Sequence, residues 1–291
     1  MIRLIKIIAA NCVIAASVAQ AQSQPTVIQG DQPNRVVIEY VKPQNPDLQD
    51  LYEILKIVHA LERIQTILSP LRLPEALTVK TVECGKINAW YRREQAGPTV
   101  TICYELLKHL RENLPSETNV GEIEPDDAKI GQVLWITLHE IGHATFDIFN
   151  VPIFGKEEDV ADNFATYVML QFAEARRLIL GAAWAWNEYM QDYKRNPVVS
   201  VRLAGFADNH GLPQERFYNL ACLAFGSNPV RFADLERFIP ATRVGNCAHE
   251  YLVLANAFHK EIHPHIDLGL AKDVVGADWL SGPVLRPEPP K

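Results

Sequence analysis

The chain has few cysteines, an excess of acids over bases and no long apolar segment beyond its first 21 residues. It contains five cysteines, 28 Lys and Arg residues against 35 Asp and Glu residues, and a formal net charge of −7. Nucleic-acid binding favours a basic face, so this balance argues against a nucleic-acid partner. The longest later apolar run, Leu178–Trp186, has nine residues. A membrane span needs about 20, so we expect none after the leader.

The first 21 residues have the pattern of a secretory signal peptide. Arg3 and Lys6 precede an apolar run over 7–18, and Ala19-Gln20-Ala21 supplies a small-x-small cleavage pattern. Cleavage after Ala21 would remove two basic residues and leave a mature chain of formal charge −9. We therefore expect an exported protein, periplasmic or extracellular. The alternative is that this run forms a first buried strand or helix.

The fifth cysteine, Cys12, lies in this leader. The mature chain would keep an even number, which favours disulfides in an exported protein. These cysteines are Cys84, Cys103, Cys222 and Cys247. Three pairings are formally possible. Pairing Cys84 with Cys103 and Cys222 with Cys247 closes the shortest loops and is the pairing we expect.

The mature length, about 270 residues, can bury a substantial core as one domain or two small ones. We expect one domain over 35–280, preceded by a flexible segment over 22–34 and followed by a disordered tail over 281–291. Apolar spacing predicts the following elements: helices over 48–68, 104–113 and 128–149 and from about residue 156, a strand over 36–41, and a hairpin-like block over 77–103. The expected fold class is α+β, mainly helical, with a small β-hairpin lobe.

The expected helix over 128–149, with Asp126 or Asp127 as its cap, contains two histidines one turn apart. His139 and His143 lie about 40° apart on one helix face, so both imidazoles can bind one Zn²⁺. Glu140 lies beside the first histidine, where its carboxylate suits a base better than a ligand. This is the H-E-x-x-H arrangement of zinc hydrolases.

A catalytic zinc needs a third protein ligand. The next expected helix offers Glu158 and Asp162, which are four residues apart and can face one target. We assign Glu158 as the third ligand and Asp162 as the acid that binds the other ring nitrogen of a ligand histidine. Glu157 and Asp159 are expected to point elsewhere and to favour the helix N-terminus.

The pair of motifs H-E-I-G-H and E-D-V-A-D resembles the gluzincin clan, which comprises the thermolysin-like and related zinc peptidases. The resemblance implies a zincin-like helix pair, ligands at His139, His143 and Glu158, and Glu140 as general base. The stretch "INAWY" resembles the edge strand with which this clan holds a substrate backbone, which implies substrate contacts at Asn88 and Ala89.

Longer stretches resemble more closely a little-characterised family of bacterial secreted metallopeptidases. They span about residues 84 to 251 and include "ECGKINAWY", "TVTICYELL", "GLPQERFYNLACLAFGS" and "RVGNCAHEY". The expected function is therefore zinc-dependent hydrolysis of a polypeptide substrate, with one Zn²⁺ per chain.

Two alternatives stay open. The same residues would serve a zinc amidase that acts on cell-wall or other non-protein amides. A secreted binding module could instead keep the metal for structure alone. The role of oxyanion stabiliser is left unassigned, with Tyr167, His249 and Tyr251 as candidates. His210 is expected to cap or pack in the turn that precedes a helix.

Overall fold

The computed structural model describes residues 35–114, 123–195 and 210–276. The expected signal peptide (1–21), N-terminal segment (22–34) and tail (281–291) lie outside these residues. No helix within the described ranges is long and apolar enough to cross a membrane.

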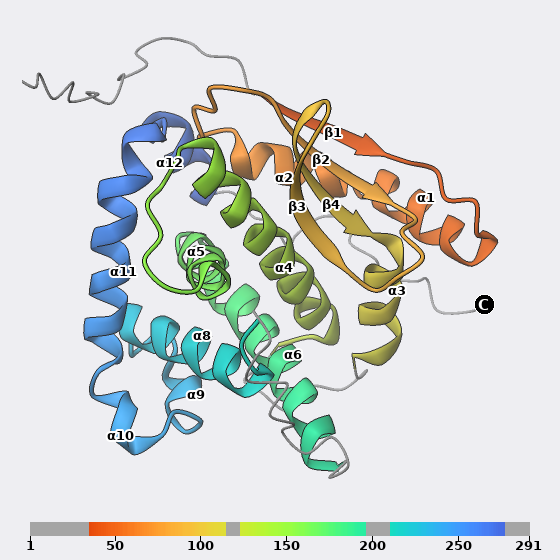
Figure 1. The fold of residues 1–291 in the computed structure, drawn as a ribbon. Helices are drawn as coiled ribbons and strands as arrows, with labels where there is room; N and C mark the ends of the chain where they lie inside the picture. Colours follow the sequence, from red (N-terminus) through yellow and green to blue (C-terminus); the bar gives the residue numbers. More distant parts are fainter. Residues whose placement is uncertain (1–34, 115–122, 196–209, 277–291) are drawn as a thin grey trace, which may run out of the picture.

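The described chain is mainly helical with one four-stranded sheet, which confirms the α+β fold class (Figure 1). Its strands are β1 (Val36–Tyr40), β2 (Leu77–Val82), β3 (Ala89–Glu94) and β4 (Gly97–Cys103). Its longer helices are α1 (Gln49–Ile57), α2 (Ala60–Leu68), α3 (Tyr104–Asn113), α4 (Pro125–Ile148), α5 (Glu157–Leu170), α6 (Ala175–Arg195), α8 (Pro213–Ser227), α11 (Cys247–Glu261) and α12 (Leu268–Gly276). Short helical turns are Pro46–Leu48, α9 (Ala233–Glu236), α10 (Ala241–Val244) and His263–His265.

The sheet has the strand order β1-β2-β4-β3. β1 pairs with β2 and β2 with β4 in parallel, whereas β3 pairs with β4 in an antiparallel hairpin. The hairpin expected within 77–103 is therefore β3–β4, and β2 joins it as a parallel neighbour. β3 forms one edge of the sheet, as the resemblance of "INAWY" implied.

Helix α4 runs through the middle of the molecule, with the sheet on one side and α11 on the other (Figure 1). Its buried positions include Leu138 and Ile141, both fully buried. Two glycines let α4 approach α6 closely, because a side chain at Gly131 would overlap the carbonyl oxygen of Leu178, and one at Gly181 that of Asp127. The H-E-I-G-H motif thus lies on a helix that is packed on several sides.

Two local expectations were wrong. The helix expected over 48–68 is two helices, α1 and α2, because His59 between them has the left-handed backbone angle φ of 54°. The cap of α4 is Glu124 rather than Asp126 or Asp127. Glu124 and Asp127 form a reciprocal capping box, and Pro125 occupies the first helical turn, where its missing N–H costs nothing.

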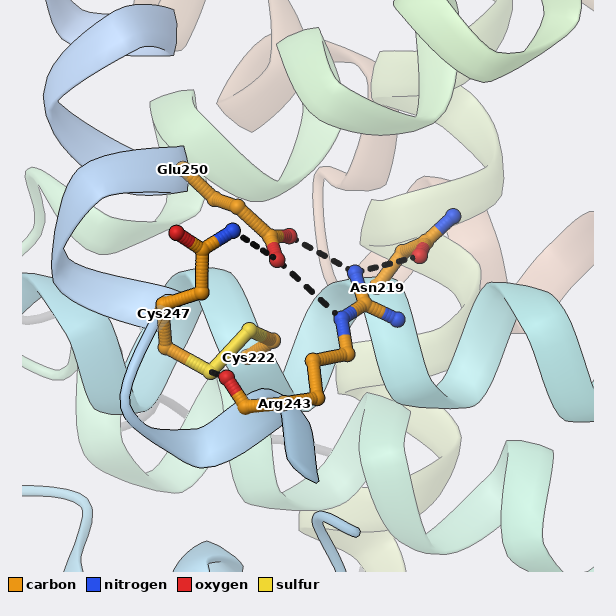
Figure 2. Close-up of a disulfide and its surroundings, with 6 residues drawn as sticks. Asn219, Cys222, Arg243, Cys247 and Glu250 are labelled. Atoms are coloured by element: carbon orange, nitrogen blue, oxygen red, sulfur yellow. Dashed lines mark hydrogen bonds and ion pairs between the residues drawn. A yellow bond between two sulfur atoms is a disulfide. The ribbon is translucent and has the colours of Figure 1, made fainter. Parts of the chain in front are cut away.

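The disulfides are Cys84–Cys103 and Cys222–Cys247, which is the local pairing. The second bridge joins α8 to α11, and Figure 2 shows the polar cluster around it. There the Arg243 guanidinium donates to Glu250 at 2.7 Å and to Asn219 at 2.8 Å. The bridge and this cluster fix the position of α8, which contributes to the site described next.

Candidate metal centre

The predicted ligands converge where α5 packs against α4. Gly142, inside the H-E-I-G-H motif, allows this approach. A Cβ there would lie 3.3 Å from the Cα of Ala161 and 3.2 Å from the Phe164 ring. A side chain at position 142 would therefore crowd the α5 backbone. The first turn of α5 therefore reaches the histidine face of α4.

Three potential ligand atoms form a triangle at this contact. His139 Nε2 lies 3.1 Å from Glu158 Oε2, and His143 Nε2 lies 3.4 Å from the same oxygen. The two Nε2 atoms are 3.2 Å apart. The His139, His143 and Glu158 side chains are 3%, 12% and 21% exposed, so the triangle faces a partly closed space.

The size of the triangle fits a tetrahedral metal. Bonds of about 2.0–2.1 Å to zinc place two ligand atoms of a tetrahedron about 3.3 Å apart. The three observed separations lie close to this value, and three protein ligands leave one position for water or substrate. Together these residues could hold a metal ion, and imidazole and carboxylate donors suit zinc among others.

The other ring nitrogens of both histidines contact carboxylates. His139 Nδ1 lies 2.6 Å from Asp162 Oδ1, and His143 Nδ1 lies 2.7 Å from Glu157 Oε1. A carboxylate at Nδ1 keeps the proton there and directs Nε2 to the metal position. The expectation that Glu157 points elsewhere was wrong, since it orients His143 as Asp162 orients His139.

Charges around the triangle shift the pKa values of the metal-free site. Burial lowers the pKa of His139, but its hydrogen bonds with Asp162 and Glu158 outweigh burial and raise that pKa to about 9. Hydrogen bonds with His139 and His143 hold the pKa of Glu158 well below its usual range. At neutral pH His139 therefore carries a proton that a bound metal ion would have to displace.

Glu140 lies beside the triangle and is only 7% exposed. Burial raises the pKa of its carboxyl group, while the two nearby histidines oppose the rise. The backbone N–H of Tyr91, on β3, lies near this carboxylate and lowers its pKa. Glu140 thus lies between the α4 helix and the edge strand and is not part of the His139–His143–Glu158 triangle.

Arg216 of α8 extends the network in a way that the sequence did not reveal. Its guanidinium donates to both Asp162 oxygens, at 2.6 and 2.8 Å. It also packs against two indole rings, with its carbon atom Cζ 4.8 Å from the centre of Trp135 and 4.5 Å from that of Trp186. The chain Arg216–Asp162–His139 therefore fixes the first histidine from a helix 54 residues away along the sequence.

His210, expected to cap or pack, lies at the site instead. Its Nε2 is 3.1 Å from Glu158 Oε2, and its ring stacks on that of His139 with 6.0 Å between centres. Its side chain is 53% exposed. By contrast, Tyr167 and Tyr251, two of the oxyanion candidates, stack on each other at 6.0 Å. The position of His210 makes it a further candidate for contact with substrate.

The backbone of the edge strand β3 can make only some of the substrate contacts expected at Asn88 and Ala89. The Asn88 carbonyl accepts a hydrogen bond from the Cys103 N–H at 3.1 Å, so it faces β4 and is not open to a substrate strand. Hydrogen-bonded and open pairs alternate in an antiparallel ladder, which turns the backbone groups of Ala89 and Tyr91 outward. The Tyr91 N–H indeed meets Glu140. The expectation was therefore wrong for the Asn88 carbonyl, whereas Ala89 faces the open edge.

A second cluster of metal-binding residue types in the described ranges is Cys84, Cys103 and Glu105. Its two thiols are joined in a disulfide, which removes them as thiolate ligands. The His139–His143–Glu158 triangle is thus the better metal site of the two.

A mainly helical α+β fold that carries a histidine pair, a nearby glutamate and an adjacent buried carboxylate is typical of metallopeptidases. The comparison with known families agrees. The chain belongs to the family DUF4344, described as "Putative metallopeptidase", which matches residues 40–261. Neither the curated proteins nor the solved structures gave a match to this chain.

Proposed function

We propose that this protein is an exported zinc metallopeptidase of the gluzincin type. The observation that carries the proposal is the triangle of His139, His143 and Glu158, whose edges match a tetrahedral zinc and which has Glu140 beside it. Membership of a metallopeptidase family supports the same reaction class.

Each side chain has a separate role in this reaction. Zinc, when bound, polarises a carbonyl group and makes a water molecule more acidic. Glu140 takes the proton of the attacking water and later gives it to the leaving amine. The Tyr91 N–H orients the Glu140 carboxylate, and burial makes that carboxylate a stronger base. Asp162, held by Arg216, keeps His139 in the tautomer that binds metal through Nε2.

The edge strand supplies a place for an extended peptide. The Ala89 N–H and C=O face outward, close in sequence to Tyr91, whose N–H reaches Glu140. A substrate that adds as a strand would pair with these groups, which recognises polypeptide backbone with little choice of side chain. This geometry favours a peptidase over the amidase alternative.

Export is part of the proposal. The disulfides Cys84–Cys103 and Cys222–Cys247 form readily in an oxidising compartment and rarely in the cytosol. The signal-peptide pattern in the first 21 residues agrees with this location.

The experiment is digestion of a mixed peptide library by the zinc-loaded mature protein, with new termini identified by mass spectrometry. Glu140→Gln is the matched control, because it keeps the shape of the side chain and leaves the three ligands intact. We expect cleavage by the wild type and a loss of about 10²–10⁴-fold in the variant at equal zinc content. An intact library together with hydrolysis of isolated cell wall in a parallel reaction would favour the amidase. Absence of any cleavage would support the binding module.

A further inference from the structure

A cavity lies on the far side of α4 from the triangle of His139, His143 and Glu158. It has a volume of about 220 Å³ and is lined by α1, α2, α3 and α4, by Thr81 and Ile102 of the sheet, and by Leu178 of α6. The α4 residues that line it include Ile130, Val133 and Thr137. At about 100° per residue these positions lie opposite His139 and His143, so the cavity is separate from the metal centre.

The lining of this cavity is almost entirely aliphatic. Ile54, Leu55, Val58 and Ile64 contribute from α1, α2 and the turn between them, and each is only half-buried. The volume exceeds the roughly 150 Å³ of an engineered apolar cavity that admits benzene. Concave, mostly apolar sites with a few polar groups are the usual form of small-molecule pockets. The cavity can therefore take an alkyl chain.

The charged residues at this cavity have one sign. Arg63, Arg111 and Lys129 line it, and no acidic residue does so among the described lining residues. Arg111 contacts Asp50 at 2.7 Å and Lys129 contacts Asp126 at 3.4 Å, and both acids are exposed, at 55% and 40%. Exposed ion pairs of this kind contribute little, so a ligand anion can replace these partners.

We propose that this cavity binds a single-chain anionic amphiphile, with the alkyl chain among the aliphatic side chains and the anionic head among the three cations. The chain as a whole is acidic, with a formal net charge of −7. Non-specific attraction would therefore select a cationic amphiphile, and preference for an anion has to come from the local cations. The proposal does not depend on the metal centre or on peptidase activity.

The test is calorimetric titration of the full mature protein with dodecanoate below its micelle concentration, against dodecyltrimethylammonium, which has the same chain length and the opposite charge. We expect saturable binding of dodecanoate to one site per chain and binding of the cation at least tenfold weaker. Octanoate and decanoate extend the series. Each methylene buried should tighten binding by about fourfold until the cavity is full. Equal binding of the two dodecyl probes, or no saturable binding, would overturn the proposal.

Paired variants locate the site. Ile54→Trp fills the cavity, whereas Ile57→Trp makes the same change on the same helix at a residue that is 68% exposed and does not line it. We expect only Ile54→Trp to abolish dodecanoate binding. Lys129→Gln should weaken binding about three- to tenfold, and Lys108→Gln, a lysine outside the lining, should not. This second pair keeps the test decisive if Ile54→Trp fails to fold. Equal effects within each pair would contradict the assignment.

Discussion

Removal of the Arg216 guanidinium should weaken both the fold and the metal centre. Arg216→Met leaves Asp162, only 6% exposed, with His139 as its remaining partner among the contacts described above. Loss of one partner of a buried ion pair costs about 3–5 kcal/mol of unfolding free energy. Loss of the stacking on Trp135 and Trp186 adds to that cost. Because Asp162 then holds His139 less firmly, zinc affinity should fall by about tenfold, the lower end for partners of metal ligands.

The chain offers a matched control for this change. Arg177 makes the same two-bond contact, at 2.8 and 3.1 Å, to the buried Asp127 at the start of α4, and Asp127 does not contact a ligand. Arg177→Met should lower the unfolding free energy, by less than Arg216→Met because Arg177 is 41% exposed, and should leave zinc affinity unchanged. Urea denaturation measures the first quantity and competition with a fluorescent chelator the second. Equal loss of zinc affinity in both variants would refute the chain from Arg216 to His139.

Three further predictions concern the ligands, the pH dependence and the first disulfide. Glu158→Ala should abolish most zinc binding, while Asp159→Ala should change zinc binding little. Elemental analysis of the purified variants measures this. A larger loss of zinc in Asp159→Ala would mean that the third ligand is misassigned. The raised pKa of His139, about 9 in the metal-free site, means that zinc must displace a proton below that pH. Burial lowers the pKa of His143, but its hydrogen bonds with Glu158 and Glu157 outweigh burial and raise that pKa as well. Zinc affinity should therefore fall by at least about tenfold for each unit of pH decrease between 8 and 6, and a flat profile in chelator competition would contradict the proton on His139. Replacing both Cys84 and Cys103 with Ser should raise KM for a peptide substrate at nearly full zinc occupancy, because the disulfide supports the base of the β3–β4 hairpin. Simultaneous loss of zinc would show that the hairpin supports the whole fold.

The grouping of His139, His143 and Glu158 could be predicted because it depends on local structure. His139 and His143 lie within one helix, and Glu158 follows after one short connection, so helical spacing alone places them on facing surfaces. The role of Glu157 could not be predicted this way. Helical spacing predicts only the direction of each Cα–Cβ bond. The Glu157 side chain is long enough for its carboxylate to contact His143 although its Cβ points elsewhere.

The rest of the centre depends on tertiary structure. Arg216 and His210 come from beyond α6, and no spacing rule relates them to Asp162 and Glu158. The direction of the Asn88 carbonyl depends on the register of β3 against β4, which a one-residue shift would reverse. The fold class, in contrast, followed from apolar periodicity, which persists along each element and tolerates local errors such as the break at His59.

The central claim is that His139, His143 and Glu158 bind one zinc ion. Elemental analysis of the mature protein, purified without chelators, tests it most directly. We expect about one zinc per chain in the wild type, loss of that zinc in His143→Ala, and retention in Glu140→Gln, whose altered carboxylate is not a ligand. A wild-type protein that contains no divalent metal and binds none on addition of zinc would contradict the account.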